Sequence, residues 1–138
     1  MLAKDLFHDN VRNALEKDGW MITADPYTLS WGKESLFVDL AAERFIAAEK
    51  GNEKIAVEIK SFVGRSQTAE LEKALGQFSL YYSVMKRTDT DRVLYLAVPD
   101  TVFVDLFEGE KGEIVMSDER LKVFCFSAES EEILKWKK

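Results

Sequence analysis

The 138-residue chain is poor in the residues that mark disulfide-bonded, flexible or membrane-spanning proteins. A single cysteine excludes an internal disulfide framework and a cysteine-rich zinc module. Two prolines and seven glycines leave little room for linkers or low-complexity segments. No apolar run approaches the length of a transmembrane helix, and the first residues lack the apolar stretch of a signal peptide. We therefore expect a cytoplasmic protein that does not contact a membrane.

The residues that are abundant are those of a globular domain. Hydrophobic residues make up 46% of the chain and charged residues 32%, which is enough for a core beneath a well-solvated surface. The length favours one domain that spans residues 1–138. The formal net charge is −6, and this acidic balance argues against a strongly basic nucleic-acid coat protein.

Hydrophobic periodicity and turn signals divide the chain into helices and strands. A helix that ends at Gly19 comes first, and Gln67–Lys86 is the clearest later helix because its apolar residues recur every three or four positions. Ala41–Glu49 has a composition that suits a helix, but the turn signal at Lys50–Glu53 favours a long hairpin, which is our prediction. The order of elements predicts an α/β sandwich around a mixed sheet. The other expected elements are the strands Trp20–Thr23, Tyr27–Trp31, Leu36–Leu40, Lys54–Phe62, Arg92–Val98 and Leu121–Phe126, a short helix from Pro99 to Gly109, and a closing element at Glu129–Trp136.

Charged side chains interrupt two of the predicted strands. Glu58 and Lys60 are two positions apart, so they project from the same face of their strand. Asp39 lies in an otherwise apolar strand, where a charged group is rarely buried unless it is paired or bound to a metal ion. If these strands pair, the three side chains converge at one end of the sheet. Two carboxylates suit a hard divalent cation such as Mg²⁺, and a lysine beside them can orient a water or stabilise charge on a phosphate.

Glu43 is a second candidate for the metal-binding acid. It shares a strand face with Asp39 if no bulge intervenes, and a turn near Lys50–Glu53 would place it opposite Lys60. Asp39 and Glu43 therefore both stay open as the acid that accompanies Glu58.

The pattern of Asp39 followed by Glu58–Lys60 resembles the signature of the PD-(D/E)xK nuclease superfamily, whose members have a restriction-endonuclease-like fold. The resemblance implies a mixed β-sheet flanked by helices. It also implies that Asp39, Glu58 and the Ile59 carbonyl hold Mg²⁺ or Mn²⁺, and that Lys60 positions the attacking water for phosphodiester hydrolysis.

The predicted long helix carries a second pattern. Gln77 and Tyr81 are four residues apart and share a helical face. This pair resembles the QxxxY motif of RecB-type members of the superfamily. The resemblance implies that both side chains support the catalytic site or contact the DNA backbone.

Further runs of sequence carry a closer resemblance that spans nearly the whole chain. They are His8-Asp9, Ala14-Leu15, Asp18–Trp20, Leu36–Leu40, Ala42–Arg44, Ile55–Phe62, Ala74–Gln77 and Arg92–Pro99. These runs resemble the XisH family, which consists of cyanobacterial proteins named as controlling factors for excision of the fdxN element, a DNA segment removed during heterocyst differentiation. The resemblance implies an accessory role in site-specific DNA excision, beside a recombinase and a companion protein, XisI.

Four further residues are candidates: His8 and Asp9 are second-tier site residues, and Ser61 and Arg65 are DNA-binding residues. Resolvase-like members of the superfamily often carry a glutamate on the first helix, and here the corresponding region offers Asp9 and His8, the chain's single histidine. Ser61 and Arg65 follow the strand that carries Glu58, and they are candidates for contacts with DNA phosphates.

Three functional hypotheses follow. The first is an accessory factor for programmed DNA excision that, if catalytic, hydrolyses a phosphodiester; the second keeps the same fold as a non-catalytic scaffold that binds XisI or the recombinase. The third is a plain α/β domain with structural charges, and it predicts Asp39 and Glu58 on opposite faces of the sheet. A homodimer is expected because duplex-acting nucleases are commonly two-fold dimers. Since the chain is acidic, we expect a metal, a dimer or a more basic partner to supply part of the DNA affinity.

Overall fold

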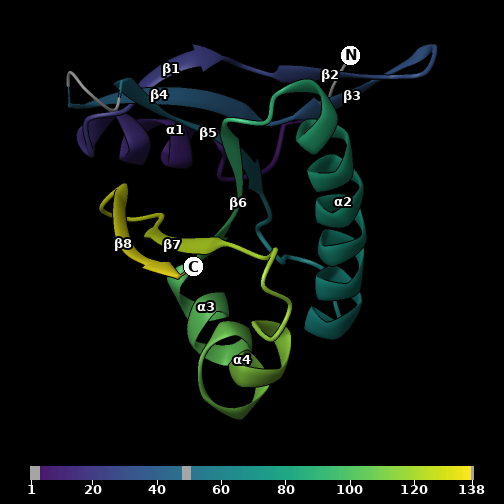
Figure 1. The fold of residues 1–138 in the computed structure, drawn as a ribbon. Coiled ribbons are helices and arrows are strands. Elements are labelled where there is room, and N and C mark those ends of the chain that lie inside the picture. The colour runs from purple at the N-terminus through teal and green to yellow at the C-terminus, as the bar shows by residue number, and fades with distance from the viewer. Residues whose placement is uncertain (1–3, 48–50, 138) are drawn as a thin grey trace.

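The computed structural model describes residues 4–47 and 51–137, and it shows a sheet with helices on both faces (Figure 1). Six strands form the main sheet in the order β1-β4-β5-β6-β7-β8, and β2 pairs with β3 in a separate two-stranded sheet. The central strands β5, β6 and β7 are parallel and the outer pairs are antiparallel, which confirms the predicted α/β class with a mixed sheet. In chain order the elements are α1 (His8–Lys17), β1 (Met21–Ala24), β2 (Tyr27–Trp31), β3 (Glu34–Val38), β4 (Leu40–Ala47), β5 (Gly51–Ile59), α2 (Gln67–Thr88), β6 (Arg92–Pro99), α3 (Asp100–Phe107), α4 (Gly109–Val115), β7 (Val123–Ser127) and β8 (Glu132–Lys137).

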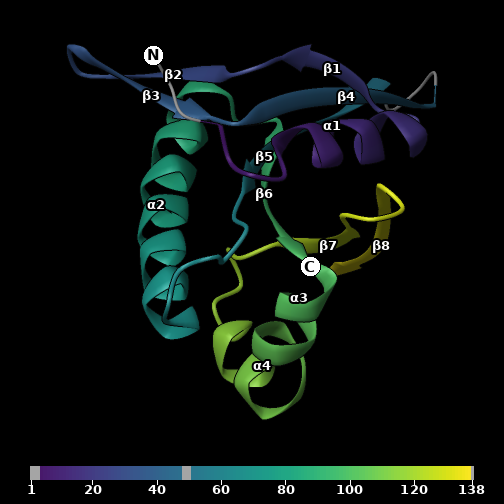
Figure 2. The same cartoon turned by 180° about the vertical axis from the view of Figure 1, so that it is seen from behind.

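The main sheet separates two hydrophobic cores. Ala56 and Leu94 belong to the core that contains residues of α2 and α3, whereas Val57 and Tyr95 belong to the core that contains residues of α1. Neighbouring residues of β5 and β6 thus enter opposite cores, as expected for central strands that are buried on both faces. Figure 2 shows α1 and α2 on either side of these strands. Among the residues that the structure describes, no helix has the length and apolarity needed to cross a membrane.

The segment from β1 to β4 forms one long ribbon that belongs to two sheets, and Figure 1 shows it extending across the molecule. It reverses direction next to Gly32, whose φ of 62° lies in the left-handed region that favours glycine. Halfway along, Asp25-Pro26 lies opposite Asp39, between the β1–β4 and β2–β3 pairs. The expectation that Asp39 lies within a strand is therefore wrong. The ladder breaks there: β2 contacts α2 and stays paired with β3, whereas β4 joins the main sheet.

The ambiguous segment after Asp39 is a strand, as predicted, and not a helix. β4 pairs with β5 in a long antiparallel hairpin. The expected turn at Lys50–Glu53 is wrong for residues 51–53, because β5 already starts at Gly51. Glu49 and Lys50 lie outside the described residues.

The register of this hairpin differs from the expected one. Glu43 lies opposite Lys54, and Ala47 lies opposite Gly51. The expected pairing of Glu43 with Lys60 is therefore wrong, because Glu43 pairs with the first half of β5 and Lys60 follows the last residue of that strand. This register moves Glu43 away from the end of the sheet where Glu58 lies.

Candidate functional site

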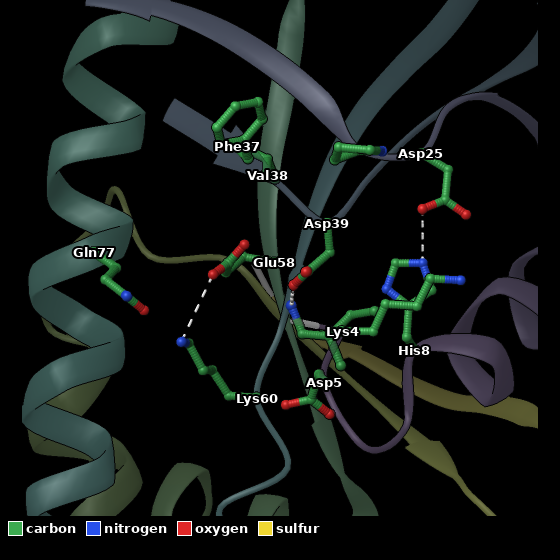
Figure 3. A pocket seen from close by; sticks show the side chains of 12 residues that line it. Lys4, Asp5, His8, Asp25, Phe37, Val38, Asp39, Glu58, Lys60 and Gln77 are labelled. Carbon is green, nitrogen blue, oxygen red and sulfur yellow. Dashed lines mark hydrogen bonds and ion pairs between the residues drawn. The ribbon is translucent and has the colours of Figure 1, made fainter. Parts of the chain in front are cut away.

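An open pocket of about 450 Å³ lies at the end of β5, beneath the ribbon and between α1 and α2 (Figure 3). The chain reaches this point from both sides of the sheet, so residues distant in sequence meet there. Six of the predicted site residues line it: His8, Asp39, Glu58, Ile59, Lys60 and Gln77.

Asp39 is held in place by the backbone of β5. Its Oδ2 atom accepts a hydrogen bond from the Ile59 amide at 2.7 Å. Because Glu58 precedes Ile59, this bond places Asp39, where the β-ladder of the ribbon is interrupted, next to the carboxylate of Glu58. Asp39 and Glu58 line the same pocket, which is the opposite of what the plain-domain hypothesis predicts.

Glu58 is a buried carboxylate with an unused acceptor. Its exposed fraction is 5%, and its Oε1 atom has no hydrogen-bond partner. Burial and the charge of Asp39 raise the pKa of Glu58 to about 8, although Lys60 opposes this, with Nζ 3.7 Å from Oε2. Burial also raises the pKa of Asp39. The pair therefore tends to retain a proton at neutral pH, and a cation bound between the two side chains would displace it.

The helix α2 carries Gln77 and Tyr81 on the side of the sheet where the two carboxylates lie. Gln77 lines the pocket, and Figure 3 shows its side chain extending from α2 toward Glu58 and Lys60. Its Oε1 atom is buried without a hydrogen-bond partner. Tyr81 does not line the pocket, but burial and the charges of Glu58 and Asp39 raise its pKa to about 12, so its hydroxyl stays protonated at neutral pH.

His8 closes the opposite wall of the pocket. Its ring is buried, and Nε2 lies 2.8 Å from Oδ1 of Asp25. Arg12 donates a hydrogen bond of 2.6 Å to the other oxygen of Asp25. Burial raises the pKa of Asp25, but the hydrogen bond from Arg12 and the nearby His8 outweigh this and lower it. Arg12, Asp25 and His8 are therefore linked by two contacts that run from the partly exposed Arg12 to the buried wall of the pocket.

Two of the predicted acids lie elsewhere. The carboxylate of Glu43 is 3.6 Å from the guanidinium of Arg92, whose side chain is 9% exposed. Asp9 is exposed on α1, with its carboxylate 3.8 Å from the ammonium of Lys4. Neither acid lines the pocket, so the geometry favours Asp39 as the acid that accompanies Glu58.

The two residues predicted to contact phosphate follow β5. The backbone amide of Ser61 donates to Oδ2 of Asp5 at 3.1 Å, a bond that ties the chain before α1 to the end of β5. Arg65 is exposed in the loop before α2. Neither residue lines the pocket, although both lie in the segment that leaves it.

Sequence reasoning missed Asp25 and Asp5, both of which line the pocket. Asp25 precedes a proline, and that pair of residues predicts only a turn. The signal that could have found it is the pairing of one histidine with a nearby acid, because a buried histidine needs a partner for its ring nitrogens.

The pocket fits a hard divalent cation with an incomplete set of protein ligands. Within residues 4–47 and 51–137, no three His, Cys, Asp or Glu side chains are grouped to hold a metal ion. Asp39, Glu58 and the Ile59 carbonyl supply oxygen donors only, which suits Mg²⁺ or Mn²⁺, because Mg²⁺ usually keeps several waters and takes phosphate oxygens as ligands. The unpartnered Oε1 atom of Glu58 is the observation on which this fit rests.

Comparison with known proteins places the chain in a family. The sequence model of the XisH family, described as XisH protein, matches residues 1–134. The chain belongs to the XisH family. This confirms the family that the sequence resembles.

Two solved structures of XisH-type proteins are similar over nearly their whole length. An XisH family protein from Nostoc punctiforme PCC 73102 is 42% identical, with a TM-score of 0.85, and the match covers 97% of this chain and 100% of that one. An fdxN element excision controlling factor protein from Anabaena variabilis is 40% identical, with a TM-score of 0.85 and coverage of 98% and 100%. No curated protein matches the chain.

Proposed function

We propose that this XisH family protein takes part in programmed DNA excision and that its pocket hydrolyses a phosphodiester with the help of Mg²⁺ or Mn²⁺. The excision role is supported by the similar protein from Anabaena variabilis, which is named as an fdxN element excision controlling factor. The hydrolytic role is supported by the meeting of Asp39, Glu58 and Lys60 in one pocket. This arrangement agrees with a PD-(D/E)xK site on a restriction-endonuclease-like fold.

The observation that carries the proposal is the state of Glu58. Its pKa is about 8, and its Oε1 atom is buried without a partner. Such an acceptor lowers the stability of the fold by about 1–3 kcal/mol, so Glu58 does not serve the fold. A divalent cation held by Asp39, Glu58 and the Ile59 carbonyl would neutralise the charge of both carboxylates. Such a cation polarises phosphoryl oxygens and lowers the pKa of water.

The remaining residues act around this pair. Lys60 lies 3.7 Å from Oε2 of Glu58, where its ammonium can orient a water and stabilise negative charge on the phosphoryl group. Gln77 offers a free acceptor to a water or to the sugar–phosphate backbone. Ser61 and Arg65, in the segment that leaves the pocket, would contact flanking phosphates.

A supercoiled-plasmid assay tests the proposal. Wild-type protein with Mg²⁺ or Mn²⁺ should convert supercoiled DNA to the nicked form, and Lys60→Ala should lower the rate at least about a hundredfold. Lys54→Ala is the matched control, because Lys54 lies on the same strand outside the pocket and should leave the rate unchanged. No cation-dependent nicking by the wild type, or equal nicking by Lys60→Ala, contradicts the hydrolytic role.

The second candidate is a non-catalytic scaffold that binds XisI or the recombinase. It is favoured by apolar side chains that the ribbon exposes. Their exposed fractions are 45% for Trp31, 38% for Phe37 and 67% for Phe45. The net charge of −6 also favours contact with a more basic partner over unaided DNA binding, and a homodimer stays a prediction. Co-purification with XisI that Trp31→Ser abolishes, together with unchanged excision in cells that carry Glu58→Gln, would favour this candidate.

A further inference from the structure

The ring of His8 has one nitrogen engaged and one unengaged. Nε2 lies 2.8 Å from the carboxylate of Asp25, which also accepts the 2.6 Å hydrogen bond from Arg12. The lowered pKa of Asp25 keeps it ionised at neutral pH, so this carboxylate only accepts hydrogen bonds. Nε2 must therefore carry a proton in this contact, and the corresponding tautomer has its lone pair on Nδ1.

The unengaged nitrogen faces the pocket. The side chain of His8 is only about 5% exposed, and its Nδ1 atom is buried without a hydrogen-bond partner. Figure 3 shows it on the side of the ring that faces Asp39, away from Asp25. The unpartnered buried side-chain atoms within the described residues number three, and they belong to His8, Glu58 and Gln77, all of which line this pocket. A lone pair in that position calls for a donor that the pocket's occupant brings.

We propose that His8 is a positioning residue whose Nδ1 atom accepts a hydrogen bond from a water in the coordination shell of the cation held by Asp39 and Glu58. Direct ligation does not fit, because His8 does not group with the two carboxylates as a third metal-binding side chain among the described residues. A water fits, since Mg²⁺ keeps several of its waters in protein sites. The Asp25–Arg12 pair acts through His8 by fixing its tautomer, as carboxylates do behind metal-site histidines. This inference rests on the proposed function, because it requires the cation site.

A nuclear magnetic resonance experiment reads the tautomer without any substitution. His8 is the only histidine of the chain, so untagged protein labelled with ¹⁵N-histidine gives the signals of one ring. At about pH 8 we expect the proton on Nε2 and the lone pair on Nδ1. Addition of Mg²⁺ should move the Nδ1 resonance toward that of a hydrogen-bonded acceptor, and Glu58→Gln should abolish the movement. A proton on Nδ1, or an Nδ1 resonance that saturating Mg²⁺ leaves in place, overturns the proposal.

Two substitutions of His8 separate its two contacts. In His8→Gln the amide reaches the Nε2 position and keeps the bond to Asp25, but it leaves the Nδ1 position without an acceptor. His8→Asn does the reverse. By titration calorimetry with Mn²⁺, we expect His8→Gln to weaken binding about tenfold or more and His8→Asn to stay within about threefold of the wild type.

The possible outcomes are distinguishable. If His8→Asn weakens binding more than His8→Gln, the histidine serves only to hold Asp25, and the proposal is wrong. If the wild type binds Mn²⁺, Asp39→Asn abolishes binding and both His8 variants bind normally, this inference fails while the cation site stands. If the wild type binds no Mn²⁺, the cation site fails and this inference fails with it.

Discussion

The hydroxyl of Tyr27 donates a 2.6 Å hydrogen bond to Oδ2 of Asp89, and this contact ties the ribbon to the end of α2. Asp89 also accepts a 2.8 Å bond from Nε of Arg92, whose guanidinium lies 4.9 Å from the centre of the Tyr27 ring. Burial and the bond to Asp89 raise the pKa of Tyr27 to about 12. Because Tyr27 lies opposite Val38, this contact holds the part of the ribbon next to Asp39.

Tyr27→Phe should therefore lower the free energy of unfolding by about 1 kcal/mol, because Asp89 loses one donor and keeps the other. Urea denaturation measures the difference. Tyr95→Phe is the matched control, since no hydrogen bond of the Tyr95 hydroxyl is found among the described residues, and it should leave stability unchanged. Equal midpoints for the wild type and Tyr27→Phe would show that the ribbon does not depend on this contact.

The buried carboxylate of Glu58 should make stability fall as pH rises. Its pKa rises from an ordinary value of 4.5 to about 8 on folding, so the folded protein binds more protons than the unfolded chain between these values. The stabilisation is complete below the unfolded pKa and is lost as pH rises through the folded one. A tenfold change in proton affinity corresponds to about 1.4 kcal/mol, so the total loss of stability is a few kcal/mol.

Denaturation of the wild type and Glu58→Gln across this pH range measures the effect. Glu58→Gln removes the ionisable group, so its stability should depend less on pH and should exceed that of the wild type at the alkaline end. Parallel pH profiles for the two proteins would contradict a raised pKa at this position.

Glu43→Gln provides the comparison for a carboxylate outside the pocket. Glu43 faces the buried guanidinium of Arg92 at 3.6 Å, so the substitution should cost about 1–3 kcal/mol of stability. It should leave the response to divalent cations intact.

At a Mn²⁺ concentration about 100 times the dissociation constant, the free energy of unfolding of the wild type and of Glu43→Gln should each rise by about 2.7 kcal/mol, and that of Glu58→Gln should rise little. Differential scanning calorimetry distinguishes the three proteins.

Two glycines in helices should respond in opposite directions to alanine. A Cβ atom at Gly112 in α4 would collide with the backbone carbonyl of Phe107, so Gly112→Ala should destabilise the protein by about 1–3 kcal/mol. A Cβ atom at Gly76 in α2 would meet no other atom, so Gly76→Ala should stabilise it by up to about 1 kcal/mol. Thermal unfolding of both variants checks the sign of each change.

The sequence predicts the elements whose patterning is local. The long helix α2 is visible because its apolar residues recur every three or four positions, and the buried strand β6 is visible because its apolar residues form a continuous run. The helix α4 is not predictable in this way, because its segment contains two glycines. One of them, Gly112, packs closely on the backbone of Phe107 in α3, a contact between helices that local patterning does not show. The division of the ribbon between two sheets is likewise invisible, because alternation specifies the face of a strand and not its partner.

The same distinction applies to the candidate site. Glu58, Lys60 and Gln77 are predictable because their spacing within one strand or helix sets their direction. The register that pairs Glu43 with Lys54 depends on the length of a turn, which the pattern of charges does not encode. The contact between His8 and Asp25 joins residues 17 positions apart across a bend that only the assembled ribbon creates.

The origin of the pocket in several elements has a consequence for folding. His8 comes from α1, Asp39 from the ribbon, Glu58 from β5 and Gln77 from α2. The parallel pairing of β5 with β6 closes only after the chain has crossed over through α2, so the pocket depends on contacts between elements that are far apart in the sequence. A ligand that binds only the folded pocket therefore stabilises the whole domain, by an amount that grows with the ratio of its concentration to its dissociation constant. Core substitutions far from the pocket will lower apparent affinity only when they destabilise the domain enough to unfold a measurable fraction of the molecules.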